Sequence, residues 1–207
     1  MFPPLYAILD PSLISRPIVP LAENLAGAGV QLMQLRDKHA GGGRFFAQSR
    51  ELAAALGPRG VRFIVNDRPD VAVLAKSGGV HVGQDDLPVE EARSVVGSGA
   101  WVGVSTHNIE QFRSANATSA DYIAVGPIFP TASKENPDPV VGLALLREVR
   151  QLTAKPIVAI GGITLETAAD VYRAGADSVA VIRDLLAGEE PARRAREYLA
   201  IAKSAGK

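Results

Sequence analysis

The sequence predicts an α/β fold of the TIM-barrel type, (β/α)8, in which eight parallel strands alternate with helices. Eight short apolar runs recur along the 207 residues, with helix-like segments between them. The runs are nearly continuous rather than alternating, which is typical of parallel strands buried on both faces. No linker or change in composition divides the chain, so we expect residues 1–207 to form a single domain. A doubly wound open sheet is the structural alternative.

The expected elements follow from these runs and from the residues that interrupt them. Asn108 is a plausible N-cap, and Gly57-Pro58 is expected to end the second helix. The expected strands cover residues 5–9, 32–35, 63–65, 79–82, 101–104, 122–125, 157–160 and 178–182. The expected helices cover about residues 19–28, 44–56, 70–77, 88–96, 108–117, 143–152, 164–174 and 191–202.

Composition excludes several classes of function. Lys+Arg and Asp+Glu both total 22, so there is no overall basic field for nucleic acid. The absence of Cys excludes disulfides, thiolate catalysis and Cys-ligated zinc. No apolar run approaches the roughly 20 residues that span a bilayer. The first five residues also lack the basic and apolar regions of a signal peptide. We therefore expect a soluble, cytoplasmic protein that does not bind membranes.

Polar residues gather where the strands end, which is the active-site face of a parallel barrel. Two neighbouring apolar runs are followed by Asn66-Asp67 and by Gln84-Asp85-Asp86. Asp67 and Asp86 are expected to lie side by side, because the ends of parallel strands meet at one mouth. Paired carboxylates suit a hard cation such as Mg²⁺, which is usually shared with substrate phosphates. Asp85 is expected to face solvent, since successive strand residues point in opposite directions.

Candidate anion ligands come from three other strand ends. Arg36 and Lys38 follow the second strand and could bind a polyanion, although a solvated charged loop is the structural alternative. Gly161-Gly162 after the seventh strand suits either a phosphate cradle or a tight turn. Arg183 after the eighth strand favours the phosphate interpretation, because a guanidinium there could reach the same anion.

Three further polar residues could serve structure or chemistry. Gln34 needs a hydrogen-bond partner if it faces the barrel interior, and a bound heterocycle or a core backbone group could supply one. His81 lies inside the fourth run and is expected to be a packed histidine. His107 could act as a general base, although a loop histidine beside an N-cap is as often structural.

Six segments in chain order form a more specific pattern. They are QLRDK at 34–38, VNDR at 65–68, VHVGQDD at 80–86, GVS at 103–105, DYIAVGPIFPT at 121–131 and AIGGI at 159–163. Together they resemble the thiamine phosphate synthase family, and the resemblance covers nearly the whole chain. One departure is Thr131-Ala132-Ser133-Lys134, where the family usually has Thr-Pro-Thr-Lys.

The resemblance implies a transferase that acts on small molecules with Mg²⁺ as cofactor. It would join 4-amino-2-methyl-5-(diphosphooxymethyl)pyrimidine to a thiazole phosphate and release pyrophosphate, giving thiamine phosphate. Members often form dimers or larger assemblies, so a homo-oligomer is possible, although the sequence does not give the oligomeric state. The implied metal ligands are Asp67 and Asp86, and the implied catalytic residues are Arg36, Lys38 and Lys134. The pyrimidine diphosphate would be held by Gln34, Arg36, Lys38, Asn66, Ser105 and Lys134. The thiazole phosphate would be surrounded by Thr131, Ala132, Ser133, Gly162, Ile182 and Arg183.

Three alternatives stay open at the level of sequence. A related thiazole tautomerase carries a histidine where this chain has Pro127. Another phosphate-binding barrel isomerase or lyase would need an acid–base pair, which the sequence does not reveal. A non-catalytic barrel that binds a phosphate ligand would not need intact Asp67, Asp86, Lys38 and Lys134.

Overall fold

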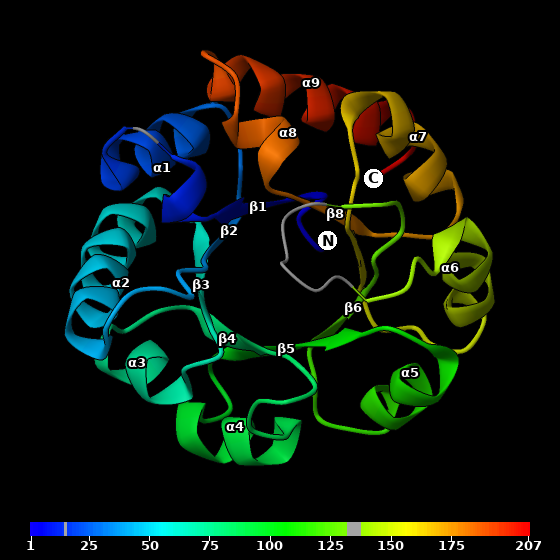
Figure 1. The fold of residues 1–207 in the computed structure, drawn as a ribbon, viewed down its shortest axis with the longest axis horizontal. Coiled ribbons are helices and arrows are strands. Elements are labelled where there is room, and N and C mark those ends of the chain that lie inside the picture. Colours follow the sequence, from blue (N-terminus) through cyan, green and yellow to red (C-terminus); the bar gives the residue numbers. More distant parts are fainter. Residues whose placement is uncertain (15, 132–137) are drawn as a thin grey trace.

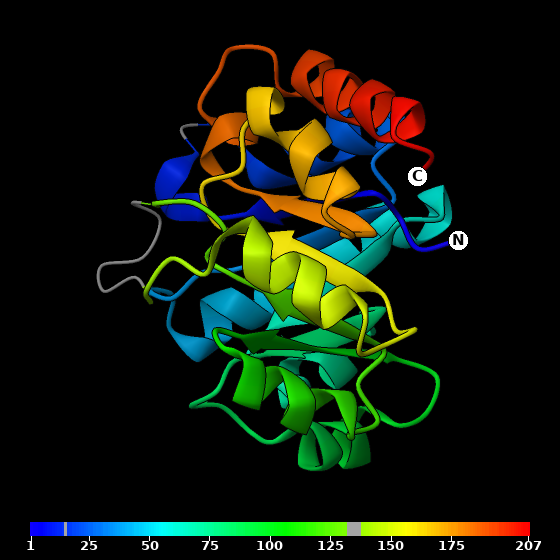
Figure 2. The same ribbon diagram turned by 90° about the vertical axis from the view of Figure 1, so that its right-hand side faces the viewer.

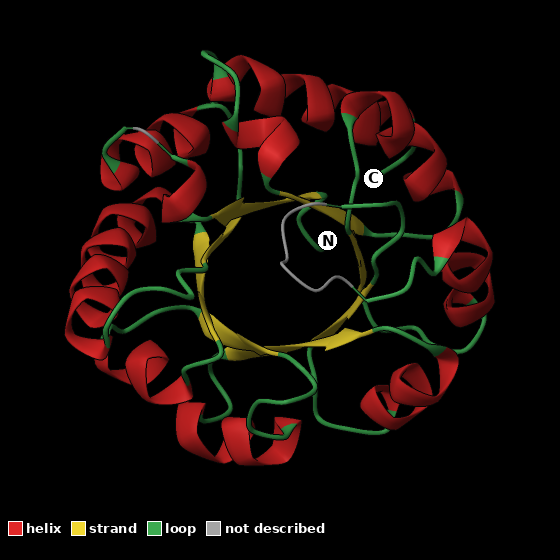
Figure 3. Ribbon diagram, in the orientation of Figure 1, coloured by secondary structure: helices red, strands yellow, loops and turns green. Residues whose placement is uncertain are grey.

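The computed structural model describes residues 1–14, 16–131 and 138–207. Eight parallel strands form one closed barrel in the order β1-β2-β3-β4-β5-β6-β7-β8. A ring of helices surrounds the strands (Figures 1 and 3). The predicted (β/α)8 fold is confirmed, and the pairing of β1 with β8 excludes the open-sheet alternative.

The elements lie close to their predicted positions. The strands are β1 Leu5–Leu9, β2 Leu32–Leu35, β3 Arg62–Asn66, β4 Gly79–Val82, β5 Trp101–Thr106, β6 Tyr122–Val125, β7 Ile157–Ile160 and β8 Ser178–Val181. The helices are α1 Ile18–Gly27, α2 Gly42–Leu56, α3 Pro69–Leu74, α4 Val89–Val96, α5 Ile109–Asn116, α6 Gly142–Arg150, α7 Leu165–Arg173, α8 Arg183–Leu186 and α9 Pro191–Ser204. Short 3-10 turns occupy Pro11–Leu13 and Gly57–Arg59. The four-residue α8 was not predicted, because it is too short to show a helical period.

The side view shows both chain termini on the same side of the barrel (Figure 2). Asn108 is the predicted N-cap of α5, and its side chain accepts a hydrogen bond from Gln111 N at 2.8 Å. Within the described residues, no helix is long and apolar enough to cross a membrane.

Two hydrophobic layers hold the barrel together. The larger layer lies between strands and helices and takes residues such as Leu5 and Leu9 from β1. The smaller layer fills the barrel interior and takes the alternate residues Tyr6 and Ile8. This division follows from the period of two along a strand, which sends successive side chains to opposite faces.

A group of aromatic side chains closes the N-terminal end of the interior. Phe2 stacks on Trp101 with ring centroids 5.1 Å apart, and both rings contact Tyr122. Gly103 on β5 makes room for Tyr122, because a Cβ atom at this glycine would lie 2.0 Å from the tyrosine ring. A contact of that length is sterically forbidden, so any larger residue at Gly103 would displace the ring.

Aspartates that precede β6 and β8 tie neighbouring strands and helices together at the same end. Asp177 accepts hydrogen bonds from Ile157 N at 2.9 Å and from Arg150 Nη1 at 2.7 Å. Asp121 makes the same kind of contact two strand–helix units earlier, where it accepts a hydrogen bond from Val102 N at 2.7 Å. These carboxylates lie at the N-terminal end of the barrel, where residues of this fold contribute to stability rather than to catalysis.

We predict that Asp177→Ala lowers the free energy of unfolding by about 1–3 kcal/mol, because Ile157 N and the Arg150 guanidinium lose a half-buried acceptor. Urea denaturation provides the measurement. Asp170→Ala is the matched control, since Asp170 pairs with Arg173 on the exposed face of α7. An exposed pair of this kind contributes about 0–1 kcal/mol. Equal losses in the two variants would contradict the assignment.

Candidate functional site

The mouth of the barrel brings together the two carboxylates predicted as metal ligands. β3 and β4 pair in parallel with Asn66 opposite His81, and the Asp67 amide donates to His81 O at 2.8 Å. This register carries Asp67 and Asp86 to the same edge, where the two carboxyl groups interact with each other. Asp86 Oδ2 accepts a hydrogen bond from Gly83 N at 2.8 Å, which fixes its side chain. Asp85 is exposed, as predicted.

Asp67 is held in an unfavourable electrostatic and conformational state. Burial raises the pKa of its carboxyl, a hydrogen bond from Lys38 lowers it, and the neighbouring Asp86 carboxyl raises it further, with a net upward shift. Its backbone also lies in the left-handed region, with φ of 60°. Left-handed backbone is uncommon for a residue other than glycine, and such positions cluster at functional sites. Lys38 Nζ forms an ion pair with Asp67 Oδ2.

Arg36 is anchored by a residue that the sequence analysis did not select. Its Nη1 donates to Asp10 Oδ2 at 2.8 Å, and both side chains are largely buried. Asp10 Oδ1 also accepts from Ser12 N and Ser12 Oγ, at 3.0 and 2.6 Å. The only sequence signal is that Asp10 directly follows the apolar run of β1. Its partner lies 26 residues away, so the pair depends on β1 and β2 being neighbours.

Gln34 and Ser105 both lie against the interior of the barrel. Gln34 faces inward, and its partner is the Tyr6 hydroxyl at 2.7 Å rather than a backbone group. Ser105 Oγ lies 2.9 Å from Nε2 of His81, which is buried as the packed histidine predicted from sequence. Tyr6 and Tyr122 were not predicted as part of the site, because tyrosine in an apolar run is expected to be core.

His107 has a structural role in the described part of the chain. Its Nδ1 lies 2.6 Å from Gly126 O and must donate there, because a carbonyl oxygen only accepts. Its backbone amide donates to Gln111 Oε1 at 2.7 Å. These bonds hold the end of β5 against the start of the loop after β6, which favours the structural interpretation over the general-base one.

The glycine pair after β7 is required by close packing. Gly161 and Gly162 have φ of 98° and 62°. A Cβ atom at Gly161 would lie 2.5 Å from Pro127 Cβ, and one at Gly162 would lie 2.4 Å from Pro130 O. The tight-turn interpretation therefore accounts for both glycines. The cradle interpretation stays a prediction, since a turn of this kind can also bind a phosphate.

Several residues predicted to surround the thiazole phosphate lie near this turn. Arg183 is the first residue of α8, and Ile182 precedes it at the end of β8. Thr131 is half-buried in the loop after β6. Ala132, Ser133 and Lys134 lie outside the described residues.

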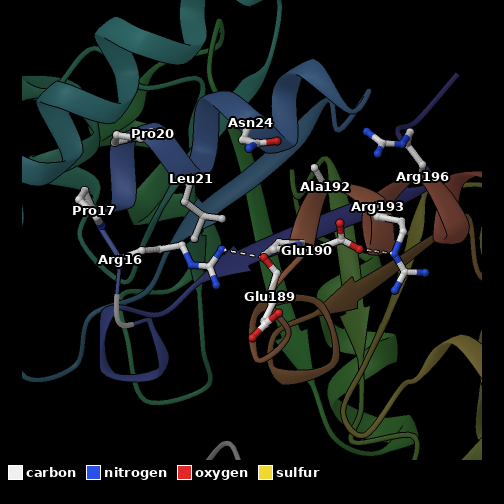
Figure 4. Close-up of a pocket in the computed structure, with 11 residues that line it drawn as sticks. Arg16, Pro17, Pro20, Leu21, Asn24, Glu189, Glu190, Ala192, Arg193 and Arg196 are labelled. Carbon is white, nitrogen blue, oxygen red and sulfur yellow. Dashed lines mark hydrogen bonds and ion pairs between the residues drawn. The ribbon is translucent and has the colours of Figure 1, made fainter.

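A cavity of about 330 Å³ lies between the N-terminal parts of α1 and α9, among the loops that follow β1 and β8 (Figure 4). Arg16 closes one side by donating to Glu189 O at 3.2 Å. Arg193 pairs with Glu190 at 2.7 Å across its other side. None of the residues predicted to hold the metal or the substrates lines this cavity, so it is not the predicted site.

Comparison with known proteins decides the family. A family model described as thiamine monophosphate synthase matches residues 5–185. The chain belongs to this family. The thiamine-phosphate synthase of Koribacter versatilis is 52% identical over 206 residues, which cover 96% of this chain and 95% of that protein. The thiamine-phosphate synthase of Methanocella arvoryzae is 41% identical over 198 residues, covering 95% and 93%.

Solved structures agree with this membership. The thiamine phosphate pyrophosphorylase of Pyrococcus furiosus superposes with a TM-score of 0.88 at 30% identity, covering 98% of this chain and 96% of that one. Membership of the thiamine monophosphate synthase family makes the chain a transferase enzyme. The enzyme class inferred from the six sequence segments is therefore confirmed.

We predict that Asp67→Asn stabilises the folded protein at about pH 7 when a chelator removes divalent cations. The folded-state pKa of Asp67 is raised, so the folded protein binds this proton better than the unfolded chain does. Its stability therefore falls as pH rises through that pKa, whereas the neutral asparagine is unaffected. Urea denaturation across pH checks this, and the advantage of the variant should shrink as pH falls.

Asp85→Asn is the matched control for this measurement, because Asp85 is an exposed carboxylate next to the same site. It should leave the free energy of unfolding unchanged. If Asp67→Asn were instead less stable at neutral pH, the contact with Lys38 would outweigh burial and repulsion from Asp86.

Proposed function

We propose that this enzyme is a thiamine phosphate synthase that uses Mg²⁺ and proceeds by departure of diphosphate before the new bond is complete. The observation that carries the proposal is the meeting of Asp67 and Asp86 with Lys38 and Arg36 at one mouth of the barrel. Carboxylates beside cationic side chains suit a diphosphate that shares a divalent cation.

The donor set fits Mg²⁺. Asp67 and Asp86 are adjacent hard oxygen ligands, and a cation between them would relieve the repulsion that helps to raise the pKa of Asp67. Among the described residues, no cluster of three or more His, Asp or Glu side chains could hold a metal ion. Asp67 and Asp86 would supply only part of the ion's ligands, and water and substrate phosphate oxygens would supply the rest.

The reaction breaks the C–O bond between the pyrimidine methylene and its diphosphate. Negative charge develops on the leaving group, and Arg36 and Lys38 stabilise it together with Lys134, which lies outside the described residues. Mg²⁺, when bound, neutralises further charge on the departing diphosphate. Lys38 pairs with Asp67 in this structure, and its ammonium group would contact the substrate phosphates when Asp67 holds the metal. Asp10 holds Arg36 in place for this task.

The other half of the reaction needs little from the protein. The electron-rich aminopyrimidine can carry the positive charge left behind, and the thiazole nitrogen attacks the methylene carbon with its own lone pair. Neither a protein nucleophile nor a strong general base is required. This agrees with the structure, in which His107 donates to a carbonyl and His81 is buried between Tyr122 and Ser105.

The thiazole phosphate is assigned to the loops after β6, β7 and β8, where barrels of this type commonly bind phosphate. Gly162 and Arg183 flank this region from the ends of β7 and β8. Gly162 would contribute its backbone amide and Arg183 its guanidinium. Ile182 and the segment from Thr131 to Lys134 would complete the contacts.

The alternatives find less support. Pro127 stands where the thiazole tautomerase has a histidine, and it is buried, has no ionisable group and packs against Gly161. A barrel isomerase or lyase would need a placed acid–base pair. His81 is bonded to Tyr122 and Ser105, and His107 is bonded to Gly126 O and lies 3.5 Å from Asp138 Oδ2, so neither is placed at the paired carboxylates of the mouth. Family membership disfavours a non-catalytic binding barrel. Cytoplasmic location stays a prediction from the sequence, and homo-oligomerisation stays an implication of the family resemblance.

We predict that the purified protein converts the pyrimidine diphosphate and the thiazole phosphate to thiamine phosphate only when Mg²⁺ is present. Asp67→Ala and Asp86→Ala should each lower the rate of pyrophosphate release roughly 100-fold or more, because the leaving group loses its metal. Coupled detection of pyrophosphate provides the measurement, with folding checked by circular dichroism.

Asp85→Ala is the matched control and should keep the wild-type rate, since this neighbouring carboxylate is exposed. Wild-type turnover in both Asp67→Ala and Asp86→Ala would refute the metal assignment. Absence of thiamine phosphate under every condition would refute the synthase activity. Interconversion of thiazole tautomers in the same tubes would then favour the tautomerase.

A further prediction concerns Asp10, which touches no substrate in the proposed mechanism. Asp10→Asn removes the charge that anchors Arg36, so kcat/KM for the pyrimidine diphosphate should fall by roughly ten- to a hundredfold. The KM for the thiazole phosphate should not change. Glu23→Gln, which breaks an exposed pair with Arg59 at 2.8 Å, is the control and should have no effect on either constant. If Asp10→Asn and Glu23→Gln had equal effects on kcat/KM, Asp10 would have no specific role in positioning Arg36.

A further inference from the structure

A continuous chain of hydrogen bonds crosses the barrel interior from β2 to β5. Gln34 Nε2 donates to Tyr6 Oη at 2.7 Å, and Tyr6 Oη lies 3.0 Å from Tyr122 Oη. Tyr122 Oη lies 3.0 Å from His81 Nδ1, and His81 Nε2 lies 2.9 Å from Ser105 Oγ. The chain begins and ends at two residues assigned to the pyrimidine, and its three inner members are buried.

Each hydroxyl in this chain carries a single proton, so the direction of one bond sets the direction of the next. Because Gln34 donates to Tyr6, the Tyr6 proton goes to Tyr122, since any other direction leaves a buried donor unused. The Tyr122 proton then goes to His81 Nδ1. Burial raises the pKa of both phenols, so both stay protonated and able to donate.

The same logic sets the tautomer of His81 and the role of Ser105. A neutral imidazole has one protonated nitrogen, and Nδ1 accepts from Tyr122, so the proton resides on Nε2. His81 Nε2 then donates to Ser105 Oγ. Ser105 is left with its own hydroxyl hydrogen to donate toward the mouth. At the other end of the chain, Gln34 Nε2 is bonded to Tyr6, so Gln34 Oε1 is the atom that can accept a hydrogen bond from the pyrimidine.

We propose that this chain fixes the hydrogen-bond polarity of the pyrimidine subsite and so selects an aminopyrimidine over an oxopyrimidine. The inference rests on the proposed function and on the family resemblance, which implies that Gln34 and Ser105 hold the pyrimidine diphosphate. An aminopyrimidine presents an N–H donor beside a ring-nitrogen acceptor, which match the Gln34 acceptor and the Ser105 donor. The oxo analogue presents a carbonyl acceptor beside an N–H donor. Its acceptor would face the Gln34 acceptor and its donor would face the Ser105 donor, so neither hydrogen bond could form.

The inner members of the chain have little freedom to rearrange. The Tyr122 ring is fully buried, and it lies where Gly103 has no side chain. His81 stacks on this ring with centroids 5.5 Å apart and an angle of 25° between the planes. Reversing the chain would therefore require the Gln34 amide to rotate and every proton to change partner. Tyr6, Tyr122 and His81 act as positioning residues, because they reach the substrate only through Gln34 and Ser105.

The tautomer of His81 can be measured in the ligand-free protein, independently of any activity. The chain has three histidines, so ¹⁵N NMR of histidine-labelled protein gives few signals, which single His→Gln variants assign. His81 is expected to carry its proton on Nε2. His107 provides an internal reference, because its Nδ1 donates to Gly126 O and must carry a proton. In Tyr122→Phe, the donor to His81 Nδ1 is lost, and His81 should show a mixture of tautomers.

Specificity is the second readout. Tyr122→Phe keeps the ring but breaks the chain, so we expect the KM for the aminopyrimidine diphosphate to rise about tenfold. The KM for the thiazole phosphate should stay unchanged. The oxopyrimidine diphosphate should inhibit the wild type weakly. In Tyr122→Phe, the ratio of its inhibition constant to the KM of the aminopyrimidine diphosphate should fall about tenfold or more. Tyr172→Phe is the matched control, because it loses a buried hydroxyl bonded to Pro4 O at 2.8 Å in the outer layer.

The outcomes separate this proposal from the proposed function. If the wild-type protein forms no thiamine phosphate, the proposed function is refuted. The NMR result then reports only the directions of the hydrogen bonds inside the barrel. A protonated Nδ1 on His81 in the wild type overturns the proposal, as does unchanged discrimination in Tyr122→Phe. If Tyr122→Phe does not fold, Tyr6→Phe decides, because it disconnects Gln34 while the pairing of Tyr122 with His81 remains. Loss of discrimination in Tyr6→Phe supports the chain, and wild-type discrimination overturns it.

Discussion

Closure of eight parallel strands into one ring is the constraint on which the rest of this molecule depends. Pairing of β8 with β1 leaves no sheet edge, and because all eight pairings are parallel, every strand has the same direction. All strand ends then open onto one mouth, which is why carboxylates from β3 and β4 meet cationic residues from β2. Closure also creates an interior that must be filled and whose polar atoms need partners. The buried chain from Gln34 to Ser105 satisfies both requirements at once.

The two ends of the barrel use the same residue types for different purposes. At the N-terminal end, Asp121 and Asp177 accept backbone amides and arginines, so their charges are satisfied and stabilise the fold. At the mouth, Asp67 is left beside Asp86, and the pKa of Asp67 is raised by burial and by that neighbour. Repulsion of this kind between two carboxyl groups lowers stability, and the proposed Mg²⁺ would relieve it. This contrast separates the structural aspartates from the proposed metal ligands better than their positions in the sequence do.

The sequence predicted what depends on local pattern. Apolar runs located the strands, and the residues that follow them located Asp67, Asp86, Arg36 and Lys38 at the mouth. It did not predict Asp10 as the anchor of Arg36, because that pair joins two strands through their register. Tyr6 and Tyr122 were missed for a related reason, since 116 residues separate two hydroxyls that only barrel closure brings together.

The glycines show why a local pattern can be explained in two ways until the fold is known. Gly161-Gly162 suggested a phosphate cradle in sequence. In the fold, Pro127 and Pro130 of the neighbouring loop lie so close that neither position has room for a Cβ atom. Gly103 belongs to the GVS segment that supports the family resemblance, but no local pattern explains why a glycine stands there. In the fold it admits the ring of Tyr122, whose hydroxyl joins the two sides of the interior. The role of each of these glycines therefore depends on which side chain or loop packs against it across the barrel. In this chain the most consequential glycine is the one that makes room for a hydrogen bond.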